Sequence, residues 1–248
     1  MPWSDMARRR RRAPINWKPW IVTGLVANLI LGTFYSPLTA VVKVQVSGAN
    51  PADQPRIKAI LQRIHDQPAM QVDRNWVEAK MLEQSAIFQA DMTRNVFGRA
   101  RVNLQYRRPV AKVAGMPGIA LGRDGVLFLS KDNLESLPSV LLPASANLPG
   151  AAIVGTWRSG EVAVLAAEMN GFMPDKPLEI VPLETGGLCL NIGSKFAVEL
   201  GYPEKLEEKV DFLRKQVEDD PALLESGKTL NLVSIERPSY RQGIVKVR

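Results

Sequence analysis

An uncharged run near the N-terminus constrains this chain more than any other feature of its sequence. Between Trp20 and Val42 there are 23 residues without a charged side chain. At about 1.5 Å per residue, a helix over most of this run approaches the roughly 30 Å thickness of a bilayer core. The sequence therefore predicts a transmembrane helix at residues 20–39, with Trp17 and Trp20 as anchors at one membrane interface.

A cluster of basic residues fixes the expected orientation of that helix. Arg8 to Arg12 precede the uncharged run, and only Lys43 follows it closely. The positive-inside rule then predicts a cytoplasmic basic tail at residues 1–19 and places the chain after about residue 42 outside the cytoplasm. A cleaved signal peptide is an alternative, although its apolar region usually spans about 7–15 residues. A nuclear-localisation or nucleic-acid-binding run is a weaker alternative for the arginines, because the apolar segment follows at once.

The charge of the remaining chain argues against a nucleic-acid-binding domain. The net charge is +7, and the first 19 residues hold six of the positive charges and only one negative charge. The rest of the chain is close to neutral, whereas nucleic-acid-binding domains usually carry basic side chains over their folded surface. Cys189 is the only cysteine, so the exported part must be stabilised by its core and not by an intrachain disulfide.

Residues 40–114 predict a β-α-α-β-β module. Val42, Val44 and Val46 alternate with polar residues, which is typical of a strand with one buried face. The spacing of the isoleucines and leucine at 57–64 predicts a helix, and a second helix is expected to begin at Asp73. Residues 87–97 and 99–107 are then predicted as two strands joined near Gly98.

Residues 115–248 predict a second, mixed α/β domain with a largely antiparallel sheet. An Asp-Gly hairpin is expected at 123–125, and Gly160–Met169 and Pro203–Val217 have helical spacing. On the second of these helices, Glu204, Glu207, Glu208 and Lys209 are expected to point mostly outward. Short strands are expected at 178–182, 188–192, 196–200, 229–235 and 243–247. The predicted fold class is therefore α+β: a transmembrane helix, the β-α-α-β-β module and this second domain.

The sequence predicts no catalytic, cofactor-binding or metal-binding residues. His65 is the only histidine and stands beside Asp66 on a predicted helix, where a surface or capping role is favoured over a general base. Cys189 alternates within an apolar strand, which favours a buried, inert thiol. Gly186-Gly187 lacks the surroundings of a phosphate-binding loop. We therefore expect a protein that is not an enzyme and has no small-molecule substrate.

Several segments, taken in order, resemble the FtsQ/DivIB family of bacterial cell-division proteins. Residues 42–48, VKVQVSG, are similar to the family's opening strand, and residues 100–111 to the strand that ends in a basic-Pro-Val-Ala run. Residues 123–128, RDGVLF, resemble the hairpin that opens its second domain. Residues 188–206 resemble its strand-strand-helix unit, and residues 232–237 with 243–248 its closing hairpin. In that family the β-α-α-β-β module is called a POTRA domain. The segment at 234–237 departs from the usual acidic-hydrophobic-Arg run.

The resemblance implies a function in assembling other proteins. It implies a single-pass protein of the bacterial cytoplasmic (inner) membrane that scaffolds septum formation and binds small coiled-coil membrane partners of the FtsB and FtsL kind. The implied binding site is a sheet edge near the C-terminus, to which a partner adds a strand. The candidate partner-binding residues are Tyr240, Gly243, Ile244, Val245, Lys246 and Val247. An internal strand without a partner is the alternative, because sequence does not separate edge from centre.

Two other functions remain as alternatives. A POTRA-bearing factor of outer-membrane protein assembly or secretion would usually carry several such modules or a long β-barrel pattern, and neither is visible. A membrane-anchored cell-wall enzyme would need a cluster of polar catalytic residues, and the sequence suggests none.

Overall fold

The computed structural model describes residues 17–35, 39–95, 97–142, 150–154 and 156–243. These residues form two compact units. Unit 1 comprises Met1–Ala79 with Asp91–Asn103, and unit 2 comprises Lys80–Ala90 with Leu104–Arg248. The predicted basic tail lies almost entirely outside the described residues, and the predicted domain boundary at 114/115 stays a prediction.

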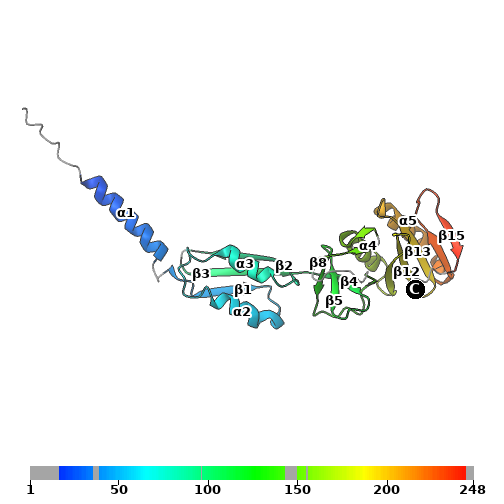
Figure 1. Cartoon of the computed structure of the whole chain (residues 1–248), viewed down its shortest axis with the longest axis horizontal. Helices are drawn as coiled ribbons and strands as arrows, with labels where there is room; N and C mark the ends of the chain where they lie inside the picture. Colours follow the sequence, from blue (N-terminus) through cyan, green and yellow to red (C-terminus); the bar gives the residue numbers. More distant parts are fainter. Residues whose placement is uncertain (1–16, 36–38, 96, 143–149, 155, 244–248) are drawn as a thin grey trace, which may run out of the picture. The chain divides into compact units, whose positions relative to one another are not determined.

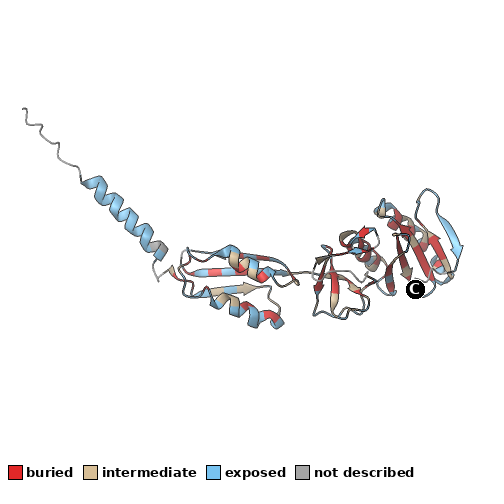
Figure 2. Ribbon diagram, in the orientation of Figure 1, coloured by how far each residue is buried: buried red, intermediate tan, exposed pale blue. Residues whose placement is uncertain are grey.

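The N-terminal helix differs from its prediction. Helix α1 spans Lys18–Tyr35, and its described side chains are exposed (Figures 1 and 2). Among the described residues, no helix combines the length and the apolar character that crossing a bilayer requires. This finding overturns the transmembrane helix predicted at residues 20–39. The uncharged run suggested a more apolar helix than the one that forms, because α1 begins at Lys18 and carries the amide of Asn28, whose Nδ2 donates to the carbonyl of Gly24 at 3.0 Å.

A three-stranded sheet in the order β1-β3-β2 follows α1 (Figure 1). Strands β1 and β3 are parallel, so that Lys43 lies opposite Arg99 and Gln45 opposite Arg101. The elements are β1 (Lys43–Ser47), the 3-10 turn η2 (Pro51–Asp53), α2 (Gln54–Gln62), α3 (Arg74–Leu82), β2 (Ile87–Arg94) and β3 (Arg99–Tyr106). The division between the two units passes through α3, β2 and β3.

Alternation along the strands gives this sheet one buried and one exposed face. In β3, Ala100, Val102 and Leu104 are buried, while Arg99 and Arg101 are exposed. Side chains of successive strand residues point to opposite faces, so the apolar set is buried and the polar set is left in solvent. The exposed side chains of β3 are therefore polar, and two of them are basic.

Unit 2 contains a ten-stranded mixed sheet in the order β15-β14-β13-β12-β11-β7-β4-β5-β6-β8. Strand β7 pairs in parallel with β4 and β11, and β13 pairs in parallel with β14. The other neighbours are antiparallel. The sheet strands are β4 (Pro109–Val113), β5 (Ile119–Gly122), β6 (Val126–Leu129), β7 (Ser139–Val140), β8 (Gly150–Ala151), β11 (Leu178–Pro182), β12 (Leu188–Ile192), β13 (Phe196–Gly201), β14 (Lys228–Asn231) and β15 (Ser239–Gln242). A separate pair is formed by β9 (Ile153–Val154) and β10 (Trp157–Arg158).

Two helices and the sheet enclose the core of unit 2. Helix α4 spans Ser159–Phe172 and packs against β4, β11 and α5 (Leu206–Asp219), which is followed by the 3-10 turn η3 (Pro221–Glu225). One buried cluster joins Leu165 of α4 and Leu213 of α5 to Leu190 and Leu230 of the sheet. The chain therefore has a mixed α/β fold with large mixed sheets, and the transmembrane helix is the part of the predicted fold that the structure overturns.

Candidate partner-binding edge

Strand β15 is the last strand of the ten-stranded sheet and is the candidate binding edge. It pairs with β14 in antiparallel register, with Tyr240 opposite Leu230 and Gln242 opposite Lys228. All four of its residues, Ser239 to Gln242, are exposed. Within the part of the chain that the structure describes, no strand lies on its outer side. A strand in this position leaves half of its backbone hydrogen-bonding groups directed away from the sheet.

The ladder between β14 and β15 shows which groups face outward. The backbone N–H of Gly243 donates to the carbonyl of Gly227 at 3.1 Å. In an antiparallel ladder, bonded and non-bonded pairs alternate. Counting back from Gly243, Arg241 and Ser239 are the residues that bond to β14. The backbone N–H and C=O groups of Gln242 and Tyr240 therefore point to the open side.

Two side-chain hydrogen bonds hold β15 in place. The Thr229 hydroxyl donates to the Gly243 carbonyl at 2.7 Å. The Tyr240 hydroxyl donates to Oε1 of Gln216 on α5 at 2.8 Å. Partial burial raises the pKa of Tyr240, with a smaller contribution from the negative charge of Asp220, so this hydroxyl keeps its proton at neutral pH. The Tyr240 hydroxyl therefore links β15 to α5 through a hydrogen bond.

A third contact crosses the face of the sheet that carries Cys189. Nη1 of Arg241 lies 3.8 Å from Oε2 of Glu199 on β13. On the same face, Nδ2 of Asn191 donates to Oε2 of Glu179 at 3.2 Å, and the Cys189 thiol lies 3.6 Å from Oδ1 of Asn191. The side chains beside the candidate edge are therefore mainly polar and are linked by hydrogen bonds and an ion pair.

The predicted site residues fall partly inside the described chain. Tyr240 lies in β15, and Gly243 follows the strand with φ of 94°. Ile244, Val245, Lys246 and Val247 lie outside the described residues. The structure adds Ser239, Arg241 and Gln242 to the edge. The sequence does not predict them, because their side chains are polar and follow a proline; the strand that it does predict begins at Gly243 and lies largely outside the described residues.

The corner before α5 contains a buried lysine that contradicts its predicted outward position. Lys209 is only 3 % exposed, and its Nζ donates to the carbonyls of Leu200 at 2.7 Å and Tyr202 at 2.8 Å. Between them, Nε1 of the buried Trp157 donates to the carbonyl of Gly201 at 2.7 Å. Burial lowers the pKa of Lys209, and the nearby Glu204 carboxylate partly opposes this shift. The hydrogen bonds at this corner hold the start of α5 in place. Helix α5 in turn carries Gln216, which accepts the hydrogen bond from the Tyr240 hydroxyl.

In the described part of the chain, the side chains that could bind a metal ion are dispersed. Among the described residues, no group of three His, Cys, Asp or Glu side chains is placed to hold a metal ion. His65 is exposed and contacts Asp66, with Nδ1 and Oδ2 2.9 Å apart. Burial raises the pKa of the Cys189 thiol to about 12, with the charge of Glu199 acting in the same direction. A thiol held in its protonated form is a poor nucleophile.

No protein-family model matches the chain, and no curated protein matches it. The resemblance to the FtsQ/DivIB family therefore rests on the sequence segments described above. The location of residues 40–248 outside the cytoplasm also stays a prediction.

Proposed function

We propose that the protein is a non-catalytic scaffold that binds other proteins by strand addition at β15. The observation that carries this proposal is the position of β15 at the end of the sheet, exposed along its whole length. A partner strand would pair with the outward backbone groups of Tyr240 and Gln242 and extend the sheet by one strand. In keeping with the sequence resemblance, we propose an FtsQ-like function in septum assembly, with coiled-coil division proteins of the FtsB and FtsL kind as partners.

Strand addition suits this edge for two physical reasons. Backbone hydrogen bonds supply affinity that does not depend on the partner's sequence, and the exposed side chains of β15 add specificity. The edge also has little in its own residues to prevent pairing. Among the described residues of β15 there is no proline and only one charge, Arg241, whereas protected edges usually carry prolines, lysines or bulges. The contacts from Tyr240 to Gln216 and from Thr229 to Gly243 fix the strand before a partner arrives.

A proline placed at Gln242 tests the proposal with little disturbance of the chain's own sheet. Gln242→Pro removes one outward N–H, and proline is tolerated in an edge strand where that N–H faces solvent. We expect it to weaken binding of FtsB- and FtsL-like partners by about tenfold, because one hydrogen bond is lost and the added ring obstructs the incoming strand. The measurement is co-purification with the tagged full-length chain from detergent extracts, quantified by mass spectrometry.

Gln242→Ala is the matched control, because it removes the same side chain and retains the N–H. Binding by this variant should stay close to that of the unsubstituted chain. Equal partner recovery by the proline and alanine variants would show that β15 is not the binding strand. Recovery of outer-membrane assembly or secretion factors in place of division proteins would contradict the division role and leave the strand-addition site standing.

A further inference from the structure

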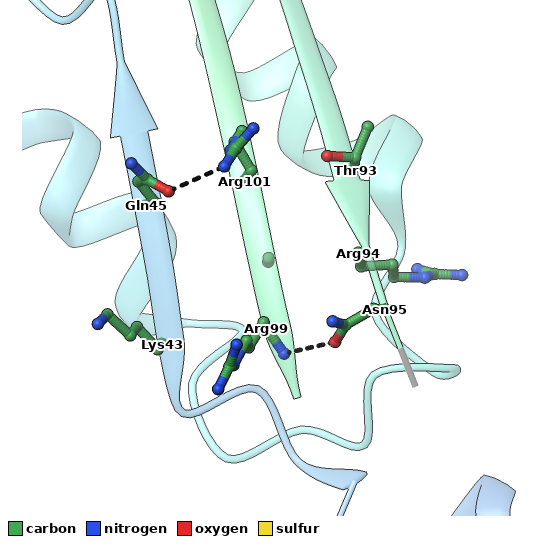
Figure 3. Close-up of a pocket in the computed structure, with 8 residues that line it drawn as sticks. Lys43, Gln45, Thr93, Arg94, Asn95, Arg99 and Arg101 are labelled. Carbon is green, nitrogen blue, oxygen red and sulfur yellow. Dashed lines mark hydrogen bonds between the residues drawn. The ribbon is translucent and has the colours of Figure 1, made fainter. Parts of the chain in front are cut away.

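A cavity with a strongly basic lining lies on the exposed face of the three-stranded sheet (Figure 3). Its volume is about 530 Å³. All three strands contribute to its lining, which consists of Lys43, Gln45, Thr93, Arg94, Asn95, Arg99, Ala100 and Arg101. Four of these side chains are cationic, three others carry hydroxyl or amide groups, and none is a carboxylate.

The strand register brings three of the cations together. Lys43 on β1 lies directly opposite Arg99 on β3, and Arg101 is two residues further along the same strand. Side chains two residues apart share a face and are roughly 7 Å apart along the strand. Figure 3 shows Arg94 directed away from Arg99, so it lies at the rim. We refer to Lys43, Arg99 and Arg101 as the cationic triad.

No carboxylate of the described residues neutralises the triad. None of its three side chains forms an ion pair with an acidic residue in that part of the chain. The one side-chain hydrogen bond of the triad runs from Nη2 of Arg101 to Oε1 of Gln45, at 3.3 Å. Asp91 is exposed on β2, two residues before Thr93, and does not line the cavity. Like charges placed directly opposite each other disfavour strand pairing, and an anion between Lys43 and Arg99 would reduce this repulsion.

We propose that the cationic triad binds a phosphate group. Guanidinium groups donate paired hydrogen bonds to phosphate oxygens, and the lysine adds a point charge. Thr93 and Asn95 supply further polar groups on the β2 side of the cavity. Ala100 is the only apolar residue in the lining, which suits a compact, fully charged group better than an apolar peptide side chain. The phosphate belongs to a lipid headgroup or to a soluble phosphate compound, and these two sources share the same recognition chemistry.

The first test is a titration of the full-length chain in neutral detergent with inorganic phosphate. Amide NMR shifts of β1 and β3 report on the site, and sodium chloride at equal ionic strength controls for screening. We expect saturable shifts centred on Lys43, Arg99 and Arg101. The double substitution Arg99→Gln with Arg101→Gln should weaken binding about tenfold or more, since two charge-assisted donors are lost.

A charge-matched control distinguishes phosphate binding at a defined site from general attraction of phosphate to a positively charged chain. Lys58→Gln with Lys215→Gln removes two exposed positive charges away from the cavity, and phosphate binding should be retained. Equal weakening in the two double variants, or non-saturable shifts spread over the whole chain, would overturn the proposal. So would tighter binding of an acidic peptide than of phosphate at the same amides. If the arginine variant does not fold by circular dichroism, the position of the shifts in the unsubstituted chain decides the outcome.

Vesicle binding distinguishes the two sources of phosphate. Full-length chain is co-sedimented with vesicles of phosphatidylglycerol and with vesicles of phosphatidylcholine. A loss of phosphatidylglycerol binding in the arginine variant, but not in the control variant, would identify a lipid headgroup. Weakened phosphate binding with unchanged vesicle binding would identify a soluble ligand. In both cases the triad is the phosphate site.

Discussion

At the scale of single residues, the corner formed by Leu200, Gly201 and Tyr202 shows how buried polar groups position the candidate edge. Three consecutive carbonyls turn inward and are met by donors from Lys209 and Trp157. Unsatisfied buried carbonyls are unfavourable, so these two side chains fix the path of the chain from β13 to α5. The lysine is used as a structural donor and not as a surface charge.

Replacing Lys209 should therefore destabilise unit 2. Lys209→Met keeps most of the side-chain volume but leaves the Leu200 and Tyr202 carbonyls without their donor. We expect the free energy of unfolding to fall by about 1–3 kcal/mol, measured by denaturant unfolding. Lys215→Met on the exposed side of the same helix is the control, with an expected change within about 0.5 kcal/mol. An equal effect of the two substitutions would contradict the structural role of Lys209.

The position of Lys209 could have been found from the sequence. Leu206, Val210, Leu213 and Val217 form an apolar stripe at helical spacing, and Lys209 stands one helical turn after Leu206 on that stripe. The residue was assigned to the surface because lysine is rarely buried. What the sequence could not show is that carbonyls from β13 meet its amine, because that depends on how β13 turns at Gly201, with φ of 65°.

At the scale of elements, the turn between β2 and β3 depends on one glycine. Gly98 has φ of 71°, and a Cβ atom there would lie 2.0 Å from the carbonyl oxygen of Ala40. The carbonyl of Gly98 also accepts the N–H of Val42 at 3.1 Å. The hairpin and the residues leading into β1 are therefore in direct backbone contact, which fixes the start of the parallel pair that carries the cationic triad.

A pair of glycine substitutions separates crowding from backbone conformation. Gly98→Ala and Gly115→Ala both place a side chain at positive φ, but only Gly98 is crowded, since the space around Gly115 is open. Each substitution should lower the free energy of unfolding by about 1–2 kcal/mol, because alanine is disfavoured at positive φ. For Gly98→Ala, the clash with Ala40 should lower the free energy of unfolding by roughly 2 kcal/mol more. Similar melting temperatures for the two variants would show that the close approach is absent.

Element types were easier to predict than the arrangement of elements. The runs at 178–182 and 188–192 were predicted with their observed bounds, because alternation and bounding glycines mark them locally. The strand Ser239–Gln242 is not predicted from the sequence, and the strand predicted at 243–247 lies, apart from Gly243, outside the described residues. β-propensity favours the valines there, whereas the observed strand is set by pairing with β14.

At the scale of the whole molecule, strand order is what sequence reasoning could not supply. The short strand β7 lies between β4 and β11, which are distant in sequence, and β14 pairs with β13 across the whole of α5. Such long-range pairings depend on the assembled core and leave no local pattern. The candidate edge exists only because β15 comes last in this order.

The division into two units predicts where a core substitution acts. Leu190 is fully buried in the cluster that joins the sheet of unit 2 to α4 and α5. Leu190→Ala should lower the free energy of unfolding of this unit by about 2–5 kcal/mol, through lost apolar burial and the cavity left behind. Fluorescence of the buried Trp157 follows its unfolding, and amide hydrogen exchange reports which residues lose protection. We expect the loss to be concentrated in Leu104–Arg248, including the amides of β14 and β15, and to leave β1 and its pairing with Arg99–Asn103 protected. An equal loss of protection in β1 would mean that the chain unfolds as one cooperative unit. A partner bound at β15 would then stabilise the cationic triad as well.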